Sequence, residues 1–106
     1  MANVLDKIIE DKKNSLKGIK KTNSLDSIEN KIKSLNNFIN FKEVITNNKG
    51  VSLIAEIKKA SPSAGELVKD FNHLNIAKMY VENGATCLSV LTEEKHFLGK
   101  LDYIRD

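Results

Sequence analysis

The sequence predicts an α/β fold, and three features of the chain support this prediction. Two mostly apolar runs, residues 51–57 and 85–92, have the composition of buried strands, and the first is of the kind that is buried on both faces. A segment with helical spacing, residues 72–82, separates them. A connection of that length favours parallel strands joined by a right-handed crossover. We therefore expect a helical extension, residues 1–48, followed by strand–helix units in residues 49–106.

The first helix is expected over residues 3–17, because apolar residues recur there at helical spacing among charged ones. Asn3 is a suitable N-cap and Gly18 a suitable stop, and a polar turn should follow at residues 20–23. The apolar positions of this helix are Leu5, Ile8, Ile9 and Leu16.

A second helix is expected after Ser24, which is a candidate N-cap. Its apolar positions step by three and four alternately over too few turns for a coiled coil, so we expect it to pack within its own domain. A short third helix is expected from Phe38, Phe41, Val44 and Ile45, and residues 47–50 should form a turn into the first strand. The stripe of the second helix is Leu25, Ile28, Ile32, Leu35 and Ile39.

A charged pair stands at the carboxyl end of the first strand. Side chains alternate across a strand, so Glu56 and Lys58 should share one face while Ala55 and Ile57 share the other. A loop rich in turn formers, residues 60–65, follows. Strand ends followed by such loops are where α/β proteins place binding and catalytic groups. The alternative is that both charges simply reach solvent.

The rest of the chain contains the crossover helix and the second strand. Asn72 should cap the helix, and the pair Asn83 and Gly84 should end it. After the second strand we expect a loop at residues 93–99 and the start of another helix at residues 100–106.

Other charged residues are interpreted as structural. Lys59 falls on the opposite strand face from Lys58 and should be solvated. The loop residues Glu93 and Glu94 are candidates for a carboxylate pair, but a run of charges in a loop is usually solvated, which is what we expect here. His73 and His96 have no second ligand at metal-site spacing, so both are expected to be surface residues. We expect neither a metal ion nor a cofactor.

Two long blocks resemble the indole-3-glycerol-phosphate synthase family. They are I-A-E-I-K-K-A-S-P-S at residues 54–63, and C-L-S-V-L-T-E at residues 87–93 followed by F-x-G at residues 97–99. The opening L-x-K-I-I at residues 5–9 is similar to the leading helix of that family. The resemblance implies a TIM (β/α)8 barrel, of which this chain would be an N-terminal fragment with a leading helical extension and the first two βα units.

The resemblance also implies a reaction and a set of site residues. The family closes an indole ring on a phosphorylated, carboxylated anilino-ribulose with loss of carbon dioxide and water, in tryptophan biosynthesis. By position in the motifs, Lys58 would bind an anionic group of the substrate and donate a proton, and Glu56 would hold neighbouring lysines charged and oriented. Ser61 would hydrogen-bond the substrate, and Phe97 would line the pocket for its aromatic ring.

The same resemblance sets limits on this chain. The principal general acid of the family, a lysine of the third strand, would lie beyond Asp106, and Ala64 replaces a lysine common in the first loop. Two strand–helix units cannot close a barrel, so the isolated chain should be marginally stable and inactive. A complementing C-terminal barrel portion, or another enzyme of the tryptophan pathway, is the expected partner.

Composition excludes several other classes. Charges of both signs alternate along the helices, the net charge is only +3, and no nucleic-acid motif is present, so no nucleic-acid partner is expected. No apolar run approaches the ~20 residues that span a bilayer. A single cysteine, Cys87, suits a cytoplasmic protein without disulfides.

Two alternatives stay open at the level of sequence. The chain could belong to another phosphate-binding (β/α)8 enzyme, such as phosphoribosylanthranilate isomerase. It could also be a non-catalytic fragment that pairs through its open sheet edge with a complementing half-barrel.

Overall fold

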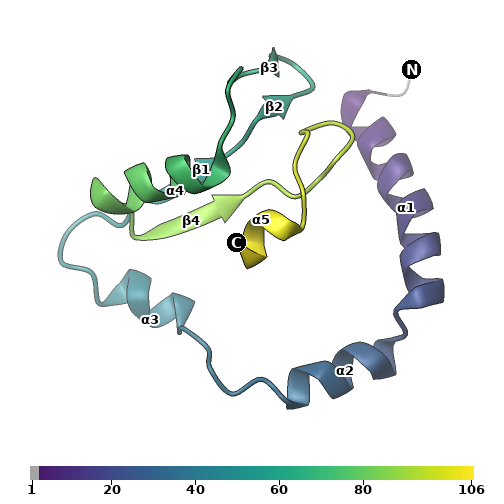
Figure 1. The fold of residues 1–106 in the computed structure, drawn as a ribbon, viewed down its shortest axis with the longest axis horizontal. Coiled ribbons are helices and arrows are strands. Elements are labelled where there is room, and N and C mark those ends of the chain that lie inside the picture. Colours follow the sequence, from purple (N-terminus) through teal and green to yellow (C-terminus); the bar gives the residue numbers. More distant parts are fainter. Residues whose placement is uncertain (1–2) are drawn as a thin grey trace. The chain divides into compact units, whose positions relative to one another are not determined.

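The computed structural model describes residues 3–106, and the chain divides into two compact units, Met1–Ile39 and Asn40–Asp106. The first two residues of the expected helical extension, Met1 and Ala2, lie outside the described residues. The first unit holds helices α1 and α2, and the second holds three helices and four short strands (Figure 1). None of the described helices is both long and apolar enough to cross a membrane.

Helix α1 covers Val4–Thr22 and begins where the sequence predicts. The Asn3 side chain accepts the backbone N–H of Asp6 at 2.8 Å, and the Asp6 carboxylate accepts the N–H of Asn3 at 3.2 Å, which forms a reciprocal capping box. The predicted stop at Gly18 is wrong, because the helix continues through it for another turn. Lys20 and Lys21 favour that last turn, since cations stabilise the carboxyl end of a helix dipole.

Helix α2 covers Leu25–Lys33, and Ser24 caps it as predicted by accepting the N–H of Ser27 at 3.2 Å. The helix ends earlier than its apolar stripe suggests. The Ser34 hydroxyl donates to the Lys31 carbonyl at 2.7 Å, and such local side-chain bonds compete with continuation of a helix. Leu35 and Ile39, expected on the stripe, therefore lie beyond the helix.

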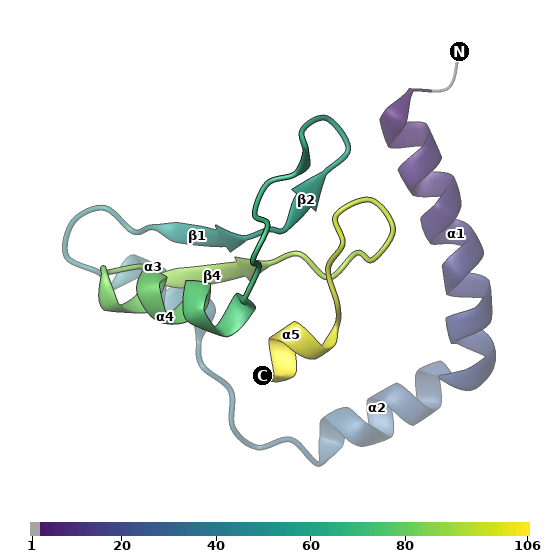
Figure 2. The ribbon, with the colours of Figure 1, turned by 45° about the horizontal axis from the view of Figure 1, so that its top comes forward.

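The second unit is built on a two-stranded parallel sheet. Strand β1 covers Ile54–Ile57 and pairs in register with β4, Cys87–Val90, so that Glu56 lies opposite Ser89. Helix α4, His73–Glu82, connects their ends, which confirms the predicted parallel strand–helix–strand unit (Figure 2). The short helix α3, Phe41–Thr46, precedes β1 and confirms the third predicted helix, but it begins after Phe38, which was expected to belong to it.

Both ends of α4 follow the sequence signals. The Asn72 side chain accepts the N–H of Asn75 at 3.0 Å and so caps the first turn. Gly84 has φ +92°, a value that glycine adopts at little cost, and it ends the helix just after Asn83.

The core of this unit lies on one face of the sheet. Ala55 and Ile57 are buried, whereas Ile54 on the alternate face is 51% exposed. The expected burial of β1 on both faces is therefore wrong for the described chain. The cause is that α4 packs on the face that carries Ala55 and Ile57, so nothing comparable covers the face of Ile54 and Glu56.

A small antiparallel hairpin follows β1 and was not expected from the sequence. Strand β2, Ala60–Ser61, pairs with β3, Gly65–Glu66, and Gly65 has φ +67°. Next to the hairpin, the N–H of Leu67, which follows β3, donates to the carbonyl of Lys59, which precedes β2, at 2.8 Å. The final helix α5, Asp102–Arg105, begins slightly later than predicted.

Candidate functional site

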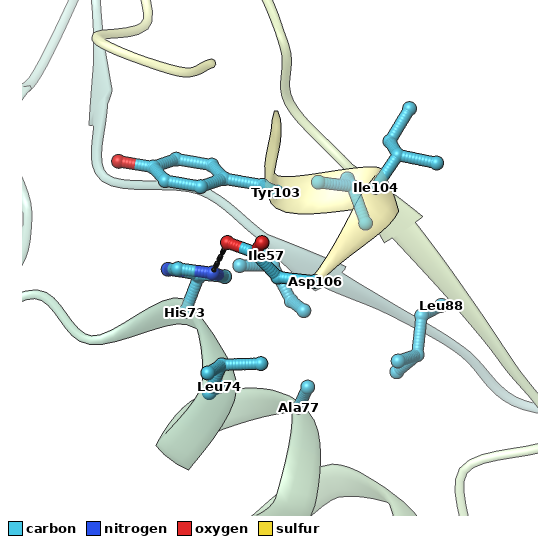
Figure 3. A pocket seen from close by; sticks show the side chains of 9 residues that line it. Ile57, His73, Leu74, Ala77, Leu88, Tyr103, Ile104 and Asp106 are labelled. Carbon is cyan, nitrogen blue, oxygen red and sulfur yellow. Dashed lines mark hydrogen bonds and ion pairs between the residues drawn. The ribbon is translucent and has the colours of Figure 1, made fainter. Parts of the chain in front are cut away.

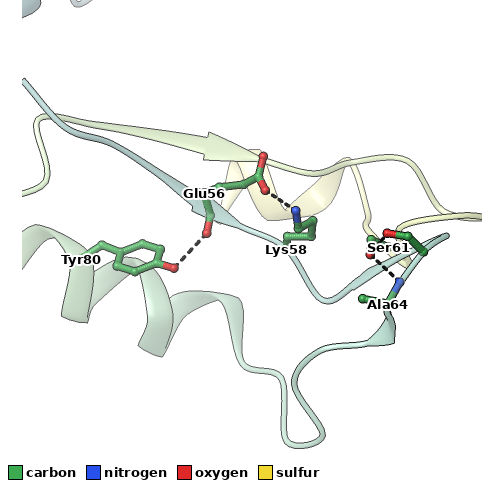
Figure 4. A network of polar contacts seen from close by, with 6 residues as sticks. Glu56, Lys58, Ser61, Ala64 and Tyr80 are labelled. Atoms are coloured by element: carbon green, nitrogen blue, oxygen red, sulfur yellow. Dashed lines mark hydrogen bonds and ion pairs between the residues drawn. The ribbon is translucent and has the colours of Figure 1, made fainter.

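The two charged residues predicted at the end of the first strand form an ion pair. The Lys58 Nζ lies 2.8 Å from Glu56 Oε1 (Figure 4). Both side chains point to the sheet face opposite α4, because Ala55 and Ile57 occupy the alternate, helix-covered face. Their side chains are 46% and 32% exposed for Glu56 and Lys58, so the pair is accessible to a ligand.

Helix α4 also helps to fix the strand that carries this pair. The Tyr80 hydroxyl donates to the Glu56 backbone carbonyl at 3.0 Å (Figure 4). The carbonyls of Leu53 and Ile57 accept N–H groups at the β4 side. The Glu56 carbonyl alternates with them and therefore points to the other edge of β1, where Tyr80 satisfies it.

Ser61 lies in β2, three residues beyond Lys58, and its hydroxyl serves the hairpin. Its Oγ accepts the Ala64 N–H at 3.2 Å and lies 3.4 Å from the Ser63 Oγ (Figure 4). Within the described chain, these hydrogen bonds of the Ser61 hydroxyl are made to residues of its own hairpin. The structure thus places Ser61 near the same strand end but does not join it to the Glu56–Lys58 pair.

Phe97 lies in the loop 93–99, which leaves the carboxyl end of β4. The Leu91 N–H donates to the Ile57 carbonyl at 3.1 Å, so β1 and β4 remain paired as far as Ile57, the residue before Lys58. Because parallel strands end at the same edge, this loop and the β2–β3 hairpin leave the sheet on the same side (Figure 2). Phe97 is half-buried, and its described hydrogen bond is to Glu93.

Glu93 organises this loop, so the expectation that it is a solvated charge is wrong. Its carboxylate accepts the backbone N–H groups of Lys95, His96 and Phe97 at 3.1, 2.6 and 3.0 Å. Its own carbonyl accepts the Gly99 N–H at 2.7 Å. The available signal was the position of an acidic residue at the start of a tight loop, where a carboxylate meets successive N–H groups.

The pKa of Glu93 reflects two opposing effects. Burial raises it, but the three backbone hydrogen bonds and the nearby His96 lower it by more, so the net pKa lies below the usual value of 4.5. The carboxylate therefore stays ionised at neutral pH and keeps its full capacity to accept the loop's N–H groups.

A pocket of ≈ 350 Å³ lies on the other face of the sheet, beneath α4 and α5 (Figure 3). None of the predicted site residues lines it. His73, expected to be an ordinary surface residue, instead pairs at its rim with Asp106 at 2.8 Å and stacks on Tyr103 with ring centroids 4.1 Å apart. The apolar lining includes Ile57, Leu74, Ala77, Leu88 and Ile104.

Among residues 3–106, no group of three or more His, Cys, Asp or Glu side chains is placed to hold a metal ion. The groups that the structure places at the carboxyl end of the sheet are an ammonium, a carboxylate and loop residues. Such a set can bind an anion and exchange a proton with it.

Comparison with known proteins gives a consistent result. The family model described as indole-3-glycerol phosphate synthase matches residues 5–106. An indole-3-glycerol phosphate synthase from Clostridium acetobutylicum is 48% identical over 103 residues, covering 96% of this chain and 39% of the relative.

Synthases from Alkaliphilus metalliredigens and Desulforamulus reducens are each 44% identical over 103 residues. Each alignment covers 97% of this chain, and 40% and 39% of the respective relative. The chain thus spans about two-fifths of the length of the curated relatives it matches.

Proposed function

This chain belongs to the indole-3-glycerol phosphate synthase family, and we propose that it contributes the first strand-end groups of such a synthase. The reaction would close the indole ring of 1-(2-carboxyphenylamino)-1-deoxyribulose 5-phosphate with loss of carbon dioxide and water. The isomerase alternative is disfavoured, because the matching family and the relatives named above are synthases.

The observation that supports this proposal most directly is the accessible Glu56–Lys58 ion pair at the carboxyl end of β1. The substrate carries a carboxylate and a phosphate, so it requires fixed cations. We assign to the Lys58 ammonium the binding of a substrate anion and the donation of a proton during loss of water. Glu56, whose Oε1 lies 2.8 Å from the Lys58 Nζ, would orient the ammonium.

Two loop residues complete the proposed contribution of this chain. Ser61 would donate a hydrogen bond to the substrate, at the expense of the contact between its hydroxyl and Ser63. Phe97 would form part of the slot for the aromatic ring, on a loop that leaves the sheet on the same side as the hairpin.

We further propose that more strands complete the sheet into the (β/α)8 barrel of the family. The described sheet has two strands, and Ile54 on its uncovered face is 51% exposed. Parallel sheets are normally covered on both faces, so an exposed isoleucine on one of their strands is unusual. The complementing portion, on the same polypeptide or a second one, would supply the remaining catalytic groups.

The role of Lys58 is testable with a neighbouring lysine as the control. In the complete gene product, meaning here this chain together with the proposed complementing barrel portion, Lys58→Met should lower kcat/KM for the anilino-ribulose substrate by about 100-fold or more, because a fixed charge at the reacting groups is lost. Lys59→Met removes an equal charge that instead pairs with Glu66 at 3.9 Å. It should change kcat/KM by less than about fivefold. Equal effects of the two variants, measured by appearance of the indole chromophore, would contradict the assignment.

A further inference from the structure

The loop 93–99 is held by one acidic side chain that the proposed chemistry does not use. We infer that Glu93 is a positioning residue, which fixes the backbone of Phe97 at the carboxyl end of the sheet so that the aromatic slot is formed before substrate binds. This inference rests on the proposed function for the role of Phe97. The ordering of the loop by Glu93 is inferred from its hydrogen bonds alone and does not depend on the proposed function.

The hydrogen bonds of Glu93 account for the path of the loop. One carboxylate oxygen accepts the His96 and Phe97 N–H groups at 2.6 and 3.0 Å, and the other accepts the Lys95 N–H at 3.1 Å. Hydrogen bonds to an ionised acceptor are roughly twice as strong as neutral ones. Three successive amides therefore turn toward one fixed point, and Phe97 is the last of them.

The far end of the loop is fixed independently. The Gly99 N–H donates to the Glu93 carbonyl at 2.7 Å, which closes the loop on the residue that begins it. Gly99 is buried against the Leu91 carbonyl group, and Leu98 adopts φ +52°. Phe97 is thus bracketed by a carboxylate anchor before it and a tightly packed glycine after it.

The adjacent residue provides a matched control. Glu94 has the same side chain, lies in the same loop and is exposed. Within the described residues its carboxylate accepts none of the loop amides that Glu93 holds. A change at Glu94 removes the same charge and leaves the anchor intact.

The test compares Glu93→Ala and Glu93→Gln with Glu94→Ala and Glu94→Gln in the complete gene product. For Glu93→Ala, we expect amide hydrogen exchange at residues 95–97 to accelerate about tenfold or more, since hydrogen bonds to a charged acceptor are among the stronger ones and these three would be lost. The KM for the anilino-ribulose substrate should rise about tenfold, with kcat changed less. Glu93→Gln keeps one acceptor oxygen, so its exchange rates and KM should lie between those of Glu93→Ala and those of the unsubstituted protein. Both Glu94 variants should have the exchange rates and KM of the unsubstituted protein.

A pH titration gives a second readout, independent of substitution. Because the fold lowers the pKa of Glu93, its contribution to loop order is complete above the usual value of 4.5 and is lost as the pH falls through the lower folded pKa. Among neighbouring titratable side chains, His96 contributes to lowering the pKa of this carboxylate. Protection of the three amides, corrected for intrinsic exchange rates, should fall below pH 4.5 in the unsubstituted protein and stay flat in Glu93→Gln.

Two results would overturn the inference. Unchanged protection of residues 95–97 in Glu93→Ala would show that the carboxylate does not order the loop. Faster exchange with an unchanged KM would show that the order of the loop does not position Phe97 for substrate. If the unsubstituted protein fails to convert the substrate, the proposed function fails, and the exchange data alone still decide whether Glu93 orders the loop.

Discussion

At the scale of single residues, neighbouring positions of the same chemical type have different roles in this chain. Lys58 pairs with Glu56 on the uncovered sheet face, whereas Lys59 pairs with Glu66 of the hairpin. The Glu93 carboxylate accepts hydrogen bonds from three backbone N–H groups, whereas the Glu94 side chain is exposed. The difference follows from backbone direction, because strand alternation and tight turns send adjacent side chains to different surroundings.

Gly99 is a residue at which any side chain is excluded. A Cβ there would overlap the Leu91 carbonyl oxygen and lie 2.7 Å from the carbonyl carbon. Both atoms belong to the backbone just after β4 and cannot rotate away. We expect Gly99→Ala to lower the free energy of unfolding of the complete gene product by roughly 1–3 kcal/mol, as overpacking does. Urea denaturation measures this, and unchanged stability would show that the loop packs differently.

At the scale of elements, N-cap residues predict where helices begin more accurately than glycines predict where helices end. Asn3, Ser24 and Asn72 each cap the helix that they precede. Gly18, by contrast, lies inside α1 although glycine often ends a helix. The difference is that an N-cap needs only a short polar side chain, whereas a glycine stop needs a chain reversal that the surrounding structure must also favour.

The position of Gly18 gives a prediction of opposite sign to that for Gly99. Gly18 lies in the helical interior, and a Cβ there would meet no atom within 4 Å. Gly18→Ala should therefore stabilise α1 by about 0.5–1 kcal/mol, because alanine loses less backbone entropy in a helix. Helix content by circular dichroism and urea denaturation of the complete gene product measure the effect. A loss of stability would instead indicate that the helix ends at Gly18.

At the scale of the whole molecule, little of the described chain is deeply buried. The core of the second unit consists of Ala55, Ile57 and Ala60, and many large apolar side chains are more than a third exposed, among them Leu53, Ile54 and Leu74. Burial of apolar surface is the main term that offsets chain entropy in folding. A sheet with two strands and one helix-covered face therefore supplies little stability by itself.

We expect the 106-residue chain alone to bind a hydrophobic dye such as ANS, to unfold in urea without a steep transition, and to show no synthase turnover. Co-expression with the C-terminal three-fifths of the Clostridium acetobutylicum relative should yield a complex that co-purifies and binds less dye. A cooperative transition above about 5 kcal/mol for the chain alone would contradict this expectation, as would measurable turnover. Unrelated half-barrel segments serve as the control for nonspecific pairing.

The elements of the second unit were largely predictable from local signals. The alternation around Glu56 and Lys58 predicts their shared face, and the Asn72 cap with the Asn83 and Gly84 stop predicts α4. The parallel pairing of β1 and β4 follows from the length of the connection between them. The shared strand face and the ends of α4 depend on residues close in sequence, and the parallel pairing depends on the length of a single connection, which is why the sequence alone determined them.

Other features depend on contacts that only the tertiary structure supplies. The role of Glu93 rests on a loop path that brings three amides to one carboxylate, and the pairing of His73 with Asp106 joins residues far apart in the chain. The one-sided burial of β1 depends on which face α4 covers. Spacing and composition determine which face a side chain shares with its neighbours, but packing decides what that face meets, because burial depends on the partner surface as much as on the strand itself.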